Sequence, residues 1–138
     1  MINVQVLNTP LDVAACQEWV TSPGAGGITL FVGTVRNQTQ GKAVVKLDFE
    51  AYIPMALSEM RKIAKQAQEK WVAEKVLIHH RIGTLKIGEI AVIIAVATPH
   101  RKASFEACAY AIDTLKETVP IWKKEFFEDG AVWVAAHP

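Results

Sequence analysis

The hydrophobic positions of this chain repeat with two different periods, and proline or glycine marks most changes between them. Period-two alternation or a short apolar run predicts strands, whereas apolar residues three and four positions apart predict helices. The expected strands cover residues 2–6, 27–36, 43–52, 75–84, 90–98, 121–127 and 131–135. The expected helices cover residues 10–20, 54–71 and 102–118. Because hairpin-length links outnumber crossovers, we expect an α+β fold in which helices cover a mostly antiparallel sheet.

Proline and small polar residues set the expected ends of the helices. Thr9 is suited to cap the first helix, with Pro10 at its first position and Asp12 in its first turn. Pro54 opens the second helix, and Pro120 stops the third.

The same patterns predict which faces are buried. Strand 43–52 is expected to turn Val45, Leu47 and Phe49 inward. The inward row of strand 27–36 is Ile28, Leu30, Val32 and Thr34, and it runs into Arg36. The third helix has the expected stripe Phe105, Cys108, Ile112, Leu115 and Val119. Strand 90–98 is apolar on both sides, so we expect it at the centre of the sheet.

Composition narrows the class of protein. A chain of 138 residues fits one domain, residues 1–138, and 51% of it is hydrophobic. Its formal net charge of +1 argues against nucleic acid as the main partner and against an anionic membrane surface. No signal peptide is visible, and Cys16 and Cys108 are too few and too distant for a disulfide framework. These features predict a cytoplasmic protein with two structural thiols.

Five cationic residues stand at the ends of hydrophobic stretches. They are Arg36, His100, Arg101, Lys116 and Lys123. A desolvated positive charge needs an anionic partner, and no acidic run lies beside these positions. We therefore expect a bound anionic ligand, one that carries phosphate.

Each of these cations also has a simpler explanation. His100 and Arg101 lie at a helix N-terminus, which favours anions, but both can be ordinary exposed residues there. Lys116 lies in a last helical turn, where it can simply complement the helix dipole. Lys123 and Lys124 alternate across a strand, so only one of them faces a given site, and Lys123 shares the face of Ile121. An ammonium crowded by other cations loses its proton more readily and can act as a base or nucleophile.

The chain shows no metal-ligand pattern. His79 and His80 fall on opposite faces of one strand and cannot chelate a metal together. His80 shares its face with Val76, Ile78 and Ile82, so we expect a hydrogen-bonded core histidine. No Cys/His ligand spacing is present, so we expect neither a bound metal nor a redox cofactor.

Several short motifs occur together in one order. They are Gly33-Thr34-Val35-Arg36-Asn37, His80-Arg81-Ile82-Gly83, Pro99-His100-Arg101, Leu115-Lys116 and Val119-Pro120-Ile121-Trp122-Lys123-Lys124-Glu125. In this combination the chain resembles the catalytic (large) subunit family of molybdopterin synthase. The resemblance implies an α/β hammerhead fold and a homodimer with a small ubiquitin-like sulfur-carrier subunit at each end, making a heterotetramer.

The resemblance also implies an activity. The C-terminal Gly-Gly thiocarboxylate of the carrier would enter a pocket and give sulfur to cyclic pyranopterin monophosphate, which forms the dithiolene of molybdopterin. Arg36, His100 and Arg101 resemble the family's binders of substrate phosphate and pterin. Lys116 and Lys123 resemble its catalytic lysines. The family site is also expected to draw residues from both protomers.

Two departures limit this transfer of roles. Thr39 stands where some relatives carry asparagine, so the loop 37–41 receives no role. Many relatives continue with a charged tail beyond the position of His137-Pro138, and no contact of such a tail is assigned.

Two alternatives remain at this level. One is a non-catalytic module that binds a phosphorylated metabolite or an acidic peptide tail through the same arginines. The other is an oligomeric scaffold whose cations pair with carboxylates across an interface.

Overall fold

The computed structural model describes residues 1–136; His137 and Pro138, noted above, lie outside the described residues. The helices are α1 (Val13–Val20), α2 (Ile53–Trp71) and α3 (Arg101–Thr118). The strands are β1 (Ile2–Leu7), β2 (Gly27–Thr34), β3 (Gln38–Thr39), β4 (Lys42–Ala51), β5 (Lys75–Arg81), β6 (Gly83–Lys86), β7 (Ile90–Thr98), β8 (Ile121–Phe127) and β9 (Val132–Ala136).

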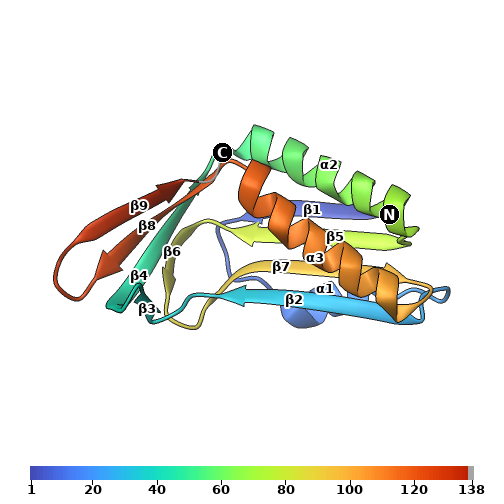
Figure 1. Ribbon diagram of the computed structural model, residues 1–138, viewed down its shortest axis with the longest axis horizontal. Coiled ribbons are helices and arrows are strands. Elements are labelled where there is room, and N and C mark those ends of the chain that lie inside the picture. Colours follow the sequence, from blue (N-terminus) through green and yellow to red (C-terminus); the bar gives the residue numbers. More distant parts are fainter. Residues whose placement is uncertain (137–138) are drawn as a thin grey trace.

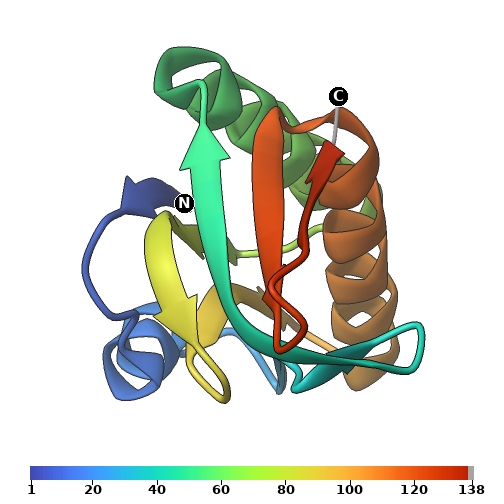
Figure 2. The same cartoon turned by 90° about the vertical axis from the view of Figure 1, so that its left-hand side faces the viewer.

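The strands form two sheets, one under the helices and one beyond their ends (Figure 1). The first sheet has the order β1-β5-β7-β2, and only its β1–β5 pair is parallel. The second sheet has the order β3-β4-β8-β9, with β6 also paired to β4, and Figure 2 views it face on. The mostly antiparallel α+β fold expected from the sequence is therefore confirmed.

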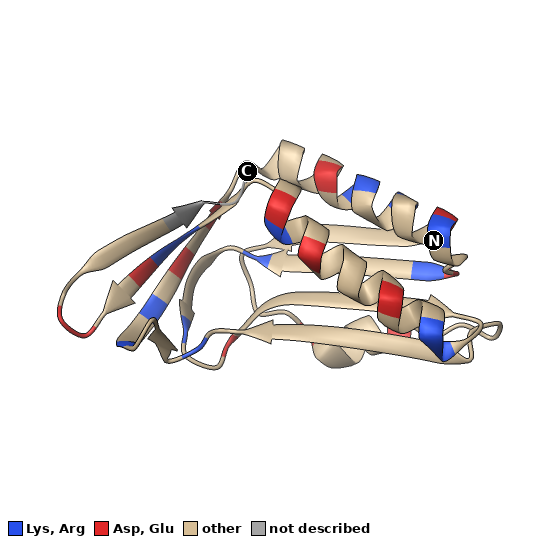
Figure 3. Cartoon of the chain, viewed as in Figure 1, with Lys and Arg blue, Asp and Glu red and all other residues tan. Residues whose placement is uncertain are grey.

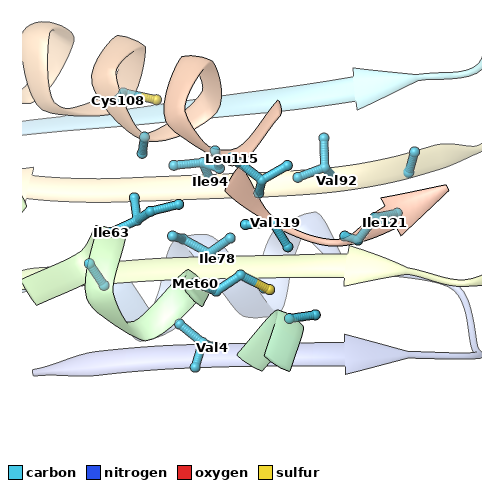
Figure 4. Packing of buried hydrophobic residues seen from close by; sticks show 14 of the residues in the cluster. Val4, Met60, Ile63, Ile78, Val92, Ile94, Cys108, Leu115, Val119 and Ile121 are labelled. Atoms are coloured by element: carbon cyan, nitrogen blue, oxygen red, sulfur yellow. The ribbon is translucent and has the colours of Figure 1, made fainter. Parts of the chain in front are cut away.

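The first sheet is covered on both faces. α2 and α3 pack on one face, and α1 packs on the other. Figure 4 shows Met60 and Ile63 of α2 and Leu115 of α3 packed toward Ile78 and Ile94 of the sheet. Every residue of β7 from Ala91 to Thr98 is buried, as its apolar run predicted. This core fixes the ends of α3 and of the strands, from which the site is built.

The chain crosses between the sheets at Gly83. The sequence predicted one strand over residues 75–84, but β5 ends at Arg81 and β6 begins at Gly83. Gly83 has a φ of +97°, a conformation that suits glycine far better than other residues. The turn lets Leu85 pair with Leu47 in the second sheet, so a single continuous strand was wrong.

Three local predictions were also wrong. Thr9 is not the cap of α1, because the helix begins at Val13 and the Asp12 carboxylate accepts the Ala15 N–H at 3.0 Å. Val45 is 49% exposed, because the β4–β8 register shifts between Val44 and Lys46 and makes Val44 the buried residue. Phe105 is 59% exposed, and Ser104 lies buried in the same turn.

The distribution of charge and the apolar character of the helices bear on which partners the protein can have. Charges of both signs are interspersed along α2 and α3 in the view of Figure 3, which shows no basic stripe there. Within residues 1–136, no helix combines the length and the apolar character needed to cross a membrane.

Candidate functional site

A cavity of about 590 Å³ lies where the two sheets meet the C-terminal end of α3. Its apolar wall includes Phe31, Val92, Leu115 and Ile121. Its charged and ionisable lining comprises Arg36, His80, Lys116, Lys123 and Glu125. These residues come from segments far apart in the sequence, and the fold brings them together.

Arg36 lies just beyond the end of β2. The β2–β7 register shifts between Gly33 and Thr34, and the strand then ends. Val35 is held on both sides by backbone hydrogen bonds, its N–H to the Glu89 carbonyl at 3.0 Å and its carbonyl to the Gly88 N–H at 2.9 Å. Val35 is buried, whereas Ile28, Thr34 and Arg36 are exposed, so the predicted inward row is wrong at both of its ends. Arg36 therefore lines the cavity as an exposed residue that follows a well-anchored strand end.

Lys116 lies in the last turn of α3. The helix ends at Thr118, where the Val119 N–H donates to the Leu115 carbonyl at 3.1 Å. Leu115 is buried in the core, whereas Lys116 is exposed and lines the cavity. The lysine thus both complements the helix dipole and contributes to the site.

Lys123 comes from β8, and the alternation of that strand selects it over Lys124. Ile121, Lys123 and Glu125 line the cavity, while Lys124 does not. The prediction that Lys123 shares the face of Ile121 is confirmed. The Lys123 Nζ lies 3.2 Å from Oε1 of Glu125, whose side chain is 1% exposed. The lysine is therefore held by a buried carboxylate.

Glu125 and His80 were missed as site residues. Alternation along β8 extends from Ile121 and Lys123 to Glu125, so the pattern contained the signal. His80 was predicted as a core histidine, and it is 5% exposed with Nδ1 2.8 Å from the Arg81 carbonyl oxygen. Because a carbonyl only accepts, His80 Nδ1 is the donor. Its ring packs edge-on against Phe49 and also lines the cavity.

His100 and Arg101 lie at the other end of α3. Neither lines the cavity, and both are exposed where β7 passes into the helix. The Thr98 hydroxyl donates to the His100 carbonyl at 2.6 Å, which fixes this turn. Fifteen helical steps separate Arg101 from Lys116, or about 22 Å at 1.5 Å per residue. Within one chain, three of the five cations therefore line the cavity, and His100 and Arg101 lie at the opposite end of α3.

A second ionisable cluster lies on the α1 side of the first sheet. His79 Nε2 is 2.9 Å from Asn3 Oδ1, and His79 Nδ1 is 3.6 Å from the Cys16 sulfur. Burial lowers the pKa of His79, and burial together with Asp12 raises the pKa of Cys16. Both groups are thus favoured in their neutral forms. Across residues 1–136, no three His, Cys, Asp or Glu side chains are grouped to hold a metal ion.

The sequence comparisons all match one protein family. The MoaE protein family model matches residues 6–118. A molybdopterin synthase catalytic subunit of Bacillus subtilis (strain 168) is 48% identical over 134 residues, covering 97% of this chain and 85% of the relative. A protein of the same name from Homo sapiens is 49% identical over 123 residues, covering 89% of this chain and 65% of the relative.

Comparisons of structure agree. The crystal structure of molybdopterin synthase from Staphylococcus aureus matches with a TM-score of 0.90 at 41% identity, over 96% of each chain. A complex of subunits 1 and 2 of molybdopterin-converting factor from Helicobacter pylori 26695 matches with a TM-score of 0.80. Its identity is 22%, over 98% of this chain and 93% of that one, so this likeness supports the fold alone.

Proposed function

Since this chain belongs to the MoaE family of molybdopterin synthase catalytic subunits, we propose that it transfers sulfur to cyclic pyranopterin monophosphate. The sulfur comes from the C-terminal thiocarboxylate of a small ubiquitin-like carrier subunit, in two rounds, and the product is the dithiolene of molybdopterin. One observation carries the proposal: Arg36 lines the same cavity as Lys116 and Lys123, although it comes from a distant part of the sequence.

The charges of the cavity suit this chemistry. The substrate phosphate and the thiocarboxylate are both anionic and repel each other in water. A partly enclosed cavity with three cationic side chains draws both in and favours oxyanion character as the acyl carbon is attacked. The planar guanidinium of Arg36 is suited to the phosphate.

The two lysines have different surroundings, which suggests different roles. Lys123 is ion-paired with buried Glu125 at 3.2 Å, so its ammonium is held in place as a fixed charge. Lys116 is exposed and has no ion pair within residues 1–136. We assign proton transfer to Lys116 and electrostatic stabilisation to Lys123.

His100 and Arg101 act, in this proposal, in the cavity of a second copy of the chain. β2 is an outer strand of the first sheet, and its Gly27 end lies against Arg101 while its Thr34 end lines the cavity. From Gly27 to Thr34 a strand spans about 23 Å at 3.3 Å per residue, close to the length of α3 between its two cationic ends.

A twofold axis beside β2 would therefore complete the site. If two β2 strands lie antiparallel across that axis, the Gly27 end of each meets the Thr34 end of the other. His100 and Arg101 of one protomer then reach the cavity of its partner. Ile28 and Phe31 of β2 are 38% and 36% exposed, and Phe105 is exposed on α3, which gives this face apolar surface to bury.

We place the reaction in the cytoplasm. Cys16 and Cys108 are both buried free thiols, which suits a reducing compartment.

The test is reconstitution with purified components. The protein is mixed with a thiocarboxylated carrier and cyclic pyranopterin monophosphate, and dithiolene formation is followed by mass spectrometry. We expect product only when all three are present. Substrate binding without any turnover would instead support the non-catalytic module.

A further inference from the structure

Glu125 is the single acidic residue in the lining of the cavity formed by residues 1–136. One carboxylate oxygen, Oε1, lies 3.2 Å from the Lys123 ammonium. The other, Oε2, is buried and has no hydrogen-bond partner among residues 1–136. A buried acceptor without a donor is unfavourable, so a ligand that supplies an N–H or O–H gains from meeting it.

The charge of Glu125 restricts what that ligand group is. A carboxylate oxygen repels phosphate and thiocarboxylate, so neither anionic group belongs beside Oε2, whereas the Lys123 ammonium also lines the cavity and can still stabilise negative charge. Arg36 and Lys116 provide cationic positions for those groups. The part of the ligand that meets Glu125 therefore carries neutral hydrogen-bond donors.

A pterin has such a group. Its 2-amino-4-oxopyrimidine ring presents an exocyclic amine beside a ring N–H, and both are donors. We propose that Glu125 is a specificity-determining residue that accepts from this edge of the substrate. The inference rests on the proposed function, which supplies a pterin as the ligand.

The geometry gives Glu125 two distinct tasks. Oε1 stays with Lys123, and that ion pair fixes the direction of the side chain. The terminal torsion of a glutamate is broad, so the carboxylate can adjust within its ion pair to let Oε2 accept from the bound ring. If Glu125 only neutralised Lys123, the cavity would bind ligands with and without the 2-amino group equally tightly.

The test measures that preference directly. The probes are 6-hydroxymethylpterin monophosphate and 6-hydroxymethyllumazine monophosphate, which differ at position 2, where lumazine carries an oxo group. Calorimetry gives both affinities for wild-type protein, for Glu125→Gln and for Glu128→Gln. Glu128 is exposed in the turn between β8 and β9, outside the cavity lining, and is the matched control.

We expect wild type and Glu128→Gln to bind the pterin at least about tenfold tighter than the lumazine. Glu125→Gln should lose this preference, because its amide N–H can donate to the oxo group. Equal wild-type affinities, or a preference unchanged in Glu125→Gln, would overturn the inference. The wild-type comparison decides even if the variant does not fold.

Failure of this inference leaves the proposed function standing. A wild-type protein without the preference can still transfer sulfur in the reconstituted reaction with its own substrate. If neither probe binds, the inference also fails, and the reconstituted reaction decides the proposed function separately.

Discussion

The backbone of Arg101 lies directly against Gly27, where a Cβ would stand 2.7 Å from the Arg101 Cα and 2.9 Å from its nitrogen. The first turn of α3 is thereby set against the start of β2. We expect Gly27→Ala to destabilise the protein by about 1–3 kcal/mol, because the obstacle is backbone that must move. Urea unfolding checks this value.

Gly24→Ala is the comparison for that prediction. A Cβ at residue 24 would meet only the end of the Glu74 side chain, which can move away. We expect a smaller loss of stability than in Gly27→Ala. An equal loss in both variants would show that contact with α3 is not what requires glycine at residue 27.

Sharing of the site between protomers predicts complementation. Lys116→Ala and Arg101→Ala should each be inactive as pure dimers. In an equal mixture, mixed dimers contain one site with both native side chains. With random pairing, about a quarter of wild-type activity should return. The mixture is made by co-expression and assayed in the reconstituted reaction.

The same mixture has an outcome that excludes sharing. If Lys116 and Arg101 of one chain served one site, no mixed dimer would contain an intact site. Activity would then stay at the level of the separate variants.

The sequence predicted the order of the helices and longer strands because apolar periodicity reports burial directly, but it missed β3 and joined β5 to β6. Pro54 and Pro120 marked helix ends correctly, and the run in β7 marked the central strand. It could not predict the register shifts at Gly33/Thr34 and Val44/Lys46, which depend on the partner strands. A slip of one residue moved Val45 from the expected core to solvent.

The site was predictable in part for the same reason. Alternation along β8 selected Lys123 over Lys124, and one further step of it would have added Glu125. The separation of Arg101 from Lys116 followed already from the expected length of their helix, since both cannot reach one cavity in the same chain. The place of Arg36 beside the cavity depends on how the end of β2 meets the second sheet, which only the folded structure reveals.

The two lysines of the cavity should respond differently to removal. Lys116→Ala should lower turnover about 100-fold or more with little change in stability, because Lys116 is exposed. Lys123→Ala should lower turnover and also cost about 3–5 kcal/mol, because Glu125 would stay buried without its cation. Reconstituted turnover and urea unfolding separate the two effects.

Lys124→Ala is the matched control for Lys123→Ala. It removes the same side chain from the neighbouring position of β8, outside the cavity lining. Turnover should stay close to that of wild type. An equal loss of turnover in both variants would contradict the assignment by strand face.

His79 should make stability fall in mild acid. An amide oxygen only accepts, so His79 Nε2 donates to Asn3 Oδ1 and Nδ1 accepts from the Cys16 thiol. Burial lowers the pKa of His79 below its ordinary value of 6.5. Between that lowered pKa and 6.5 the unfolded chain binds more protons than the folded one, so stability decreases as the pH falls through this window.

The slope from one such group is at most about 1.4 kcal/mol per pH unit, and it vanishes below the folded-state pKa. His79→Gln cannot take up this proton, yet its amide N–H can still donate to Asn3. Urea unfolding at pH 7.5 and pH 5.5 should show a smaller acid loss in His79→Gln than in wild type. Equal losses would mean that other groups carry the acid sensitivity, because the variant removes only the titration of His79 from the difference.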